Sequence, residues 1–473
     1  MPRHDAVVIA VFIADITRHA APGPSRHSLT GLTVQDSDMG TNTTVASVFK
    51  PLLTVALGED PAVRFEFWDG SSLTPENGHS GTVVVRSKDA LKNLVWAPGE
   101  LGLARCYVSG LLDFEGDIFG ILRALQQTAP RDARLGADAA VQALNAARRL
   151  GALGWKPEPP AEEAHQHGRR HSKRRDSEAI THHYDVGNDF YALVLGTSMT
   201  YSCARFVGPD ADGAAGPDAD LALEDAQAAK HDLVCRKLGL DHRTGQDLLD
   251  VGCGWGSMVI HAATHYGARA VGITISSAQA ELARKRVAQA GVSDRVEIRL
   301  QDYRDLGGER FDAISSIGMF EHVGAERTAD YFNTLRALLR PRGRLLNHAI
   351  SSPGGSRISP RSFIGRYVFP DGELLDAGAT AQAMQESGFE LRDIEALREH
   401  YALTLRHWVA NLQANWTEAV DLVGIGRARV WLLYMAASAL GFEDGGIGIH
   451  QILGVVPDED GTAGLPGNRR SWA

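Results

Sequence analysis

Leu248-Leu249-Asp250-Val251-Gly252-Cys253-Gly254-Trp255-Gly256 decides the fold of this chain of 473 residues. A short, mainly apolar run such as 248–251 is typical of a buried strand. Glycine at every second position after it lets the backbone turn sharply and lets a ligand approach main-chain atoms. The stretch therefore predicts a buried strand that ends in a ligand-binding turn.

Two kinds of nucleotide-derived ligand fit such a turn. A dinucleotide calls for G-x-G-x-x-G and for an acidic residue about 20 positions further on. This chain has Ser257 in place of the third glycine, and Thr274-Ile275-Ser276 where the acid would stand. S-adenosylmethionine (SAM) fits better, because Asp302 can accept from the adenine amine and Tyr303 can pack against its ring.

Strand and helix patterns alternate from residue 246 onward. This alternation is typical of a doubly wound parallel sheet in an α/β fold. The predicted strands are 247–251, 268–275, 295–300, 311–317 and 344–350, and the predicted helices are 277–290, 328–339, 380–387 and 429–440.

The rest of the chain differs in composition. Residues 1–40 are expected to be disordered, with Met39 as an alternative start. A small mixed α/β domain is expected over 41–155, a basic linker over 156–178, the catalytic domain over 179–457 and a flexible tail over 458–473. In the small domain we predict strands at 63–68 and 82–85 and helices at 89–96, 117–127 and 139–150.

Charge and cysteine content narrow the function. The net charge of −10 argues against nucleic acid as a partner. The basic run 165–175 predicts attraction to anionic headgroups, at roughly 1 kcal/mol per basic residue, although a solvated linker explains it equally well. Four scattered cysteines without CxxC spacing predict a reducing compartment, the cytoplasm, and no metal site; they are Cys106, Cys203, Cys235 and Cys253.

Several blocks of sequence resemble the cyclopropane fatty acid synthase and mycolic acid methyltransferase family. They occur in the family's order and spacing between about Ala179 and Gly454. The blocks are His183–Phe190, Met199–Ala204, Leu249–Gly256, Gln301–Asp305, Gly318–Gly324 and Arg366–Pro370. The resemblance implies a Rossmann-like class I SAM-dependent methyltransferase domain. Leu103 to Phe114 also resembles the small lipid-interaction domain of the full-length phospholipid-acting synthases.

The same resemblance implies the cofactor contacts. Thr274 and Gln279 would replace the usual ribose carboxylate. The full set is Tyr201, Ser202, Gly252, Gly254, Gly256, Thr274, Ile275, Gln279, Asp302, Tyr303 and Ile317.

A bicarbonate ion beside the reacting carbons is also implied by the resemblance. Its expected ligands are the backbone of Cys203 and Ile350 and the side chains of Glu321, His348 and Tyr401. One departure is Ser438, where some members of the family carry a cysteine, so thiol chemistry is excluded at that position.

The implied chemistry is methyl transfer from SAM to the double bond of an unsaturated fatty acyl chain. Attack leaves a carbocation, and loss of a proton then closes a cyclopropane ring or gives a 10-methylene branch. The pocket must exclude water. Aromatic side chains expected to line it are Tyr184, Phe320, Tyr367, Phe369 and Trp408.

Two other classes of function remain as alternatives: a methyltransferase acting on small molecules or nucleic acid, and a lipid-binding protein without catalysis. The expected partners are an unsaturated phospholipid or fatty acyl substrate and the surface of an anionic membrane, with a homodimer left open. We therefore expect a cytoplasmic protein in peripheral contact with the membrane.

Overall fold

The computed structural model describes residues 43–58, 60–97, 99–128, 145–152, 154–164, 186–207, 217–359, 361–370 and 372–465. These residues form two compact units that divide after Ala161. The expectations for residues 1–40, for the basic run 165–175 and for Tyr184 lie outside the described residues.

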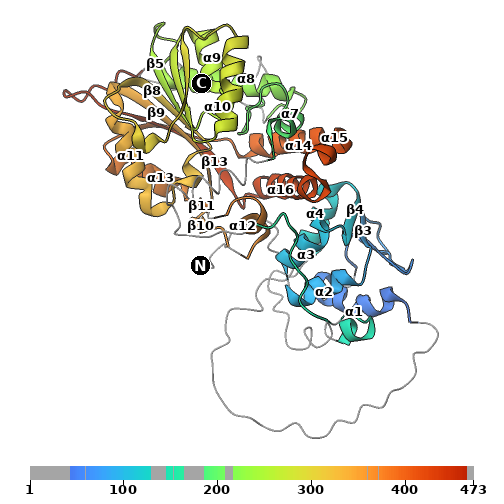
Figure 1. Ribbon diagram of the computed structural model, residues 1–473. Coiled ribbons are helices and arrows are strands. Elements are labelled where there is room, and N and C mark those ends of the chain that lie inside the picture. Colours follow the sequence, from blue (N-terminus) through green and yellow to red (C-terminus); the bar gives the residue numbers. More distant parts are fainter. Residues whose placement is uncertain are drawn as a thin grey trace. The chain divides into compact units, whose positions relative to one another are not determined.

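The N-terminal unit is built on a four-stranded sheet (Figure 1). The strand order is β2-β1-β3-β4, with β1 and β3 parallel and the other neighbours antiparallel. The structure confirms the predicted strands and the first two helices of this unit, and it adds α1, α3 and β4. Its elements are α1 (Val45–Leu57), β1 (Arg64–Phe67), β2 (Ser72–Leu73), β3 (Gly81–Val85), α2 (Asp89–Trp96), α3 (Glu100–Val108), β4 (Leu112–Gly116) and α4 (Ile118–Thr128).

The C-terminal unit is built on a seven-stranded sheet of order β12-β13-β9-β8-β5-β6-β7. Neighbouring strands from β9 to β7 are parallel, which confirms the predicted doubly wound core. The strands are β5 (Asp247–Val251), β6 (Arg269–Thr274), β7 (Val296–Leu300), β8 (Phe311–Ile317), β9 (Leu339–Ser351), β12 (Glu390–Ala396) and β13 (Gly448–Val455).

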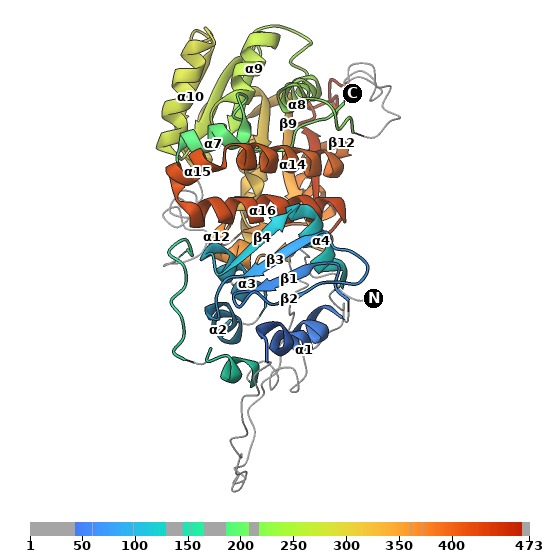
Figure 2. The same cartoon turned by 90° about the vertical axis from the view of Figure 1, so that its right-hand side faces the viewer.

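Helices cover both faces of this sheet (Figures 1 and 2). Successive strand residues point to opposite faces, so Leu248 packs in one hydrophobic cluster and Leu249 in the other. The first cluster includes α8 (Leu223–Leu238), α9 (Ser257–Tyr266) and α10 (Ser277–Gln289), and the second includes α11 (Thr328–Ala337) and α13 (Ala377–Glu386).

The far side of the sheet differs from the predicted pattern. Strand β13 is antiparallel to both β9 and β12, and neither β12 nor β13 was predicted. Helices α14 (Arg398–Ala414) and α16 (Ile425–Glu443) run side by side (Figure 2). The remaining elements of the unit are α7 (Asn188–Leu195), β10 (Ser356–Arg357), α12 (Phe363–Tyr367), β11 (Glu373–Leu374) and α15 (Trp416–Val423).

The segment after β13 contacts the C-terminal unit over its described part. Arg342 pairs with Asp458 at 2.8 Å, and Arg344 donates to the carbonyl of Gly464 at 3.3 Å. Ala463 is buried. Specific contacts therefore hold residues 458–465, and the rest of the expected tail, residues 466–473, lies outside the described residues.

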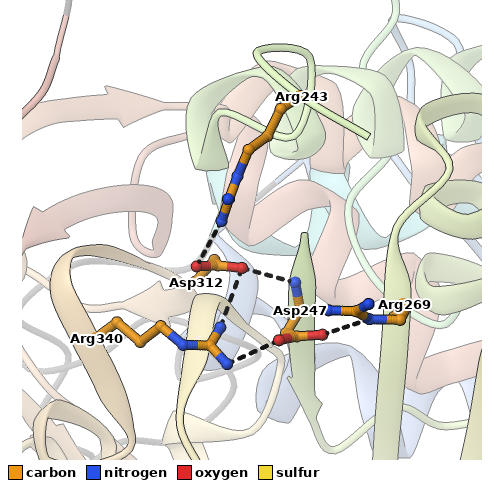
Figure 3. A network of polar contacts seen from close by, with 5 residues as sticks. All are labelled: Arg243, Asp247, Arg269, Asp312 and Arg340. Atoms are coloured by element: carbon orange, nitrogen blue, oxygen red, sulfur yellow. Dashed lines mark hydrogen bonds and ion pairs between the residues drawn. The ribbon is translucent and has the colours of Figure 1, made fainter. Parts of the chain in front are cut away.

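A network of charged side chains joins the amino ends of four strands (Figure 3). Arg340 of β9 contacts Asp247 of β5 at 2.8 Å and Asp312 of β8 at 3.1 Å. Arg269 of β6 contacts Asp247 at 2.8 Å, and Arg243 contacts Asp312 at 3.0 Å. Because Asp312 also accepts from the backbone N–H of Asp247, the network ties β5 to β8 at the edge opposite the glycine turn.

Asp247→Asn is expected to lower the free energy of unfolding by about 1 to 2 kcal/mol at pH 7, because it removes charge-assisted hydrogen bonds. Burial raises the pKa of Asp247, but Arg269 and Arg340 outweigh it and hold the pKa below 3.8. The ionised form therefore stabilises the fold at neutral pH. The difference in unfolding free energy between Asp247→Asn and the unchanged protein should narrow as the pH falls through the folded-state pKa. Urea denaturation at several pH values measures this.

Glu281→Gln is the matched control for this prediction. Glu281 forms an exposed ion pair with Lys285, four residues away on the same helix. Such pairs contribute about 0.3 to 0.5 kcal/mol. Equal stabilities for Asp247→Asn and the control at pH 7 would remove the network from the energetics of the fold.

Candidate cofactor and active site

The glycine turn after β5 has the backbone conformation that its sequence predicts. Gly252, Gly254 and Gly256 have φ values of 79°, 54° and 83°, in the left-handed region. A Cβ atom at Gly252 would lie 3.3 Å from the Cβ atom of Met319. Gly252 and Gly254 border a cavity, whereas Gly256 precedes α9 and faces Ala283 of α10. Gly256 thus allows close helix packing.

The cavity lies at the carboxyl edge of the parallel strands, where ligands of doubly wound sheets bind. All predicted cofactor residues except Gly256 line it. They are Tyr201, Ser202, Gly252, Gly254, Thr274, Ile275, Gln279, Asp302, Tyr303 and Ile317. The cavity is also lined by residues that no sequence motif indicated, among them Lys230, His231 and Arg327.

Several polar groups at the cavity are already oriented by neighbours. Thr274 Oγ1 donates to Gln279 Oε1 at 2.8 Å, and both side chains are buried. Asp302, the expected adenine contact, accepts from Arg304 Nε at 2.9 Å and from its Nη2 at 2.6 Å. These contacts hold the Asp302 carboxylate just beyond the carboxyl end of β7.

The segment that carries Tyr201 and Ser202 is held by helix α8. Gln227 donates to the carbonyl of Ser202 at 2.9 Å, and Lys230 Nζ donates to Ser202 Oγ at 3.0 Å. Met199, just before, has a φ of 49°, which is uncommon for a residue other than glycine. Side chains from α8 therefore fix a strained segment against the cavity.

The structure brings three of the predicted anion ligands together. The backbone N–H of Ile350 donates to Glu321 Oε1 at 2.8 Å. Glu321 Oε2 and His348 Nε2 are both buried, and no described residue hydrogen-bonds to either atom. Gln451 Nε2 approaches His348 Nδ1 at 3.1 Å; with Nδ1 as the acceptor, the neutral ring carries its proton on Nε2. One acceptor and one donor are thus buried without partners in the described structure.

Burial sets the charge of this pair. It raises the pKa of Glu321 to about 7, although the hydrogen bond from Ile350 acts in the opposite direction. Burial also lowers the pKa of His348 well below its ordinary value, helped by the charges of Lys230 and Lys237. Glu321 can therefore exchange a proton near neutral pH, while His348 remains neutral.

Cys203 and Tyr401, the other predicted ligands, lie on segments joined to each other. Cys203 Sγ lies 3.6 Å from the carbonyl of Leu397, the residue before α14. The next backbone N–H, that of Ala204, donates to Thr404 Oγ1 in α14 at 3.0 Å. Tyr401 lies in the same helix and is buried. Burial raises the pKa of the Cys203 thiol, which is therefore neutral.

Aromatic side chains extend from the cavity into the C-terminal helices. The rings of Tyr201 and Trp408 are 5.3 Å apart between centroids, and those of Trp408 and Tyr401 are 6.0 Å apart. Trp408 is fully buried. Trp408 thus connects the wall of the cavity to Tyr401.

A second branch of aromatic contacts includes Tyr434, which the sequence did not indicate. Its hydroxyl lies 3.3 Å from that of Tyr201, and its ring centroid lies 5.7 Å from that of Phe369. Phe369 in turn lies 6.2 Å from His322, which lines the cavity. Burial raises the pKa of Tyr434 to about 12, so its hydroxyl is neutral. Phe369 and Trp408 therefore each contact a residue that lines the cavity, although neither lines it itself.

Two other residues predicted for the substrate pocket contact different parts of the unit. Phe320 packs in the core against Tyr331 and Phe332, with ring centroids 5.7 and 5.2 Å apart. Tyr367 is buried, and its hydroxyl donates to Glu163 at 3.4 Å. Neither residue borders the cavity that Tyr201 and Asp302 line.

The strand order, the glycine turn and the cavity at the carboxyl edge define a class I SAM-dependent methyltransferase fold. The chain belongs to the mycolic acid cyclopropane synthetase family, which it matches over residues 171–452. It is therefore a SAM-dependent fatty acid methyltransferase of the cyclopropane synthase type.

Three known proteins place it within this family. "Probable fatty acid methyltransferase Rv3720" of Mycobacterium tuberculosis is 42% identical over 425 residues, which are 88% of this chain and 96% of that protein. The cyclopropane-fatty-acyl-phospholipid synthase of Escherichia coli K12 is 36% identical over 282 residues, 60% of this chain and 69% of that protein. The mycolic acid cyclopropane synthase CmaA1, crystallised with S-adenosylhomocysteine and CTAB, has a TM-score of 0.53 and 32% identity, covering 59% of this chain and 98% of its own.

Proposed function

We propose that the enzyme transfers a methyl-derived carbon from SAM to the cis double bond of an unsaturated acyl chain in a phospholipid and produces a cyclopropane fatty acid. One observation carries this proposal: a buried acceptor on Glu321 and a buried donor on His348, both without hydrogen-bond partners among the described residues. Methyl transfer to an alkene leaves a carbocation, and removal of its proton calls for a base held in a dry site.

The aromatic residues around the cavity suit a cationic intermediate. Tyr201 and Trp408 present large apolar faces and exclude water, which would otherwise capture the cation as a hydroxyl. An aromatic face close to a cation contributes roughly 0.5 to 2 kcal/mol. The donor cavity and these aromatic rings would thus hold the reacting carbons between them.

The donor and acceptor atoms in this site also fit bicarbonate. The ionised Glu321 Oε2 can accept the hydroxyl hydrogen of that ion, and the Nε2–H of His348 can donate to one of its oxygens. Tyr401 and the backbone N–H of Cys203 would complete the ligand set. A bound bicarbonate would supply a small general base, and such assistance is typically worth about 10² to 10⁴ in rate.

A 10-methylene product is the alternative within the same chemistry. It arises when the proton leaves a carbon adjacent to the cation instead of the new methyl group. Incubation with labelled SAM and defined unsaturated phospholipids, followed by fragmentation and hydrogenation of the products, distinguishes the two, because ring and branch have equal mass. If the label from SAM appeared in a small molecule and in neither lipid product, the proposal would be overturned.

We further propose that the N-terminal unit contacts the membrane. Trp155 is 92% exposed and Trp96 is 49% exposed. Trp96 Nε1 donates to the carbonyl of Gly154 at 3.2 Å, so the two indoles belong to one surface. Lys92 lies beside Gly154 on that surface. Tryptophan beside lysine is typical of protein surfaces at the lipid headgroup level. No helix within the described ranges is long and apolar enough to cross a bilayer.

Trp155→Ser is expected to lower binding to anionic phospholipid vesicles roughly 5- to 30-fold, since about 1 to 2 kcal/mol of apolar burial is lost. Its free energy of unfolding should not change, because the side chain is exposed. Vesicle sedimentation measures the binding. Ile394→Ser, at an exposed position of the C-terminal unit, is the control and should bind like the unchanged protein. Equal binding by both variants would exclude this surface.

A further inference from the structure

Helix α8 carries two buried lysines in different surroundings. Lys230 and Lys237 are each 1% exposed. Lys237 contacts Asp393 at 2.9 Å and Glu395 at 2.5 Å. Lys230 has no carboxylate oxygen within 4.0 Å among the residues that the structure describes, and its Nζ donates to the neutral hydroxyl of Ser202. Among the described residues, direct carboxylate partners are thus found for Lys237 and not for Lys230.

Lys230 is also the lysine that borders the cavity, together with Ser202. A buried ammonium without a counter-ion is costly, and proteins tolerate it where a ligand supplies the negative charge. The position of Lys230 beside a cavity therefore points to an anionic group on whatever occupies that cavity.

The methyl donor of this enzyme class carries such a group. SAM has a neutral adenosine end and an amino-acid end with an α-carboxylate. Asp302 and Tyr303, expected at the adenine, follow β7. Lys230 lies on the helix that precedes β5, two strands away in the sheet, which corresponds to about 10 Å. Lys230 and the residues expected at the adenine therefore line different parts of the cavity.

We propose that the ammonium of Lys230 binds the α-carboxylate of SAM, and equally that of the product S-adenosylhomocysteine, and so holds the amino-acid end of the donor. The proposal rests on SAM as the donor but not on the identity of the lipid product. Ser202 would orient the ammonium through its hydroxyl.

The charge state of Lys230 supports this assignment. Burial lowers the pKa of Lys230 to about 8, while Asp250 and Cys203 act in the opposite direction. A bound carboxylate favours the protonated form, so binding should take up a proton near and above pH 8. The titratable groups around Lys230 are His231 and Cys235 on α8, Asp250 on β5, Cys203 before α8, His261 on α9 and His348 on β9.

The test compares two ligands that differ in the amino-acid end. S-adenosylhomocysteine carries the carboxylate, whereas 5′-methylthioadenosine lacks the amino-acid portion. Calorimetric titration of the full chain should show that Lys230→Met lowers the affinity for S-adenosylhomocysteine about 10- to 100-fold. This is the usual range for a hydrogen bond to a charged group. Its affinity for 5′-methylthioadenosine should stay unchanged. Lys237→Met is the matched control and should retain both affinities while unfolding at a lower temperature.

Each outcome is decisive. An equal loss for both ligands in Lys230→Met would assign the lysine a structural role, and no loss for either would show that it makes no contact; both results overturn the proposal. If Lys230→Met does not fold, the unchanged protein still provides the test. Its preference for S-adenosylhomocysteine over 5′-methylthioadenosine must fall as the pH rises above 8, and a constant preference overturns the proposal. Failure of the unchanged protein to bind S-adenosylhomocysteine at all would instead reject SAM as the donor.

Discussion

Glu321→Gln is expected to lower turnover about 10²- to 10⁴-fold, the range that general-base assistance supplies. SAM affinity should remain unchanged, because Glu321 does not line the donor cavity. The amide can still accept from the N–H of Ile350 but cannot be ionised. Single-turnover measurements with labelled SAM, alongside calorimetric binding of S-adenosylhomocysteine, separate these two effects.

The pH dependence sharpens this prediction. Since burial raises the pKa of Glu321 to about 7, the turnover of the unchanged enzyme should rise through that pH as the carboxylate ionises. The variant should lack this rise. Glu326→Gln, an exposed position five residues on, is the control and should keep both rate and pH profile. Full turnover in Glu321→Gln would remove the carboxylate from the mechanism.

The stability of Glu321→Gln should not fall with its turnover but should stay the same or rise. A carboxyl group whose folded-state pKa is raised favours the protonated form, so its ionisation destabilises the fold above the unfolded-state pKa of about 4.5. Glu321→Gln should therefore be at least as stable as the unchanged protein at pH 8. A gain in stability with a loss of turnover is the behaviour of a group retained for catalysis.

Trp408→Ala is expected to lower the free energy of unfolding by about 3 to 5 kcal/mol, the usual cost of removing a large buried aromatic side chain. Trp408 is fully buried between Tyr201 and Tyr401, so truncation leaves a cavity beside the donor site. Urea denaturation followed by far-ultraviolet circular dichroism measures the loss. Turnover should fall as well, since water could reach the reacting carbons.

Two comparisons test the origin of this effect. Trp408→Phe keeps an aromatic ring and should lose much less stability. Trp155→Ala removes an exposed indole of the other unit and should lose almost none. A Trp408→Ala protein as stable as Trp155→Ala would contradict the packing that the structure describes.

The sequence allowed the central strands to be predicted because their signals are local. Strands β5 and β8 were predicted with the bounds that the structure has, since each contains buried apolar residues and lies beside a turn. Strand β12 is largely half-exposed, and β13 contains Gly448 and Gly454, so neither gave a strand pattern. The reversed direction of β13 depends on packing between distant segments, which a periodicity does not encode.

The same distinction applies to the site. Residues that follow the carboxyl ends of parallel strands could be grouped in advance, because those ends meet at one edge. Tyr434 and Gln451 could not be assigned to the site in advance. Tyr434 lies 233 residues from its partner Tyr201 in the sequence, and Gln451 lies 103 residues from His348. The role proposed for Lys230 came from the structure alone, by comparing its surroundings with those of Lys237 on the same helix.

The position of β13 has a consequence for synthesis of the protein. This strand is the last of the seven to leave the ribosome, yet it inserts between β9 and β12 and carries the amide that contacts His348. Every residue that lines the cavity precedes Thr328 in the chain, whereas the amide beside His348 is supplied by this last strand. The neighbour of the imidazole is therefore synthesised after the whole lining of the cavity.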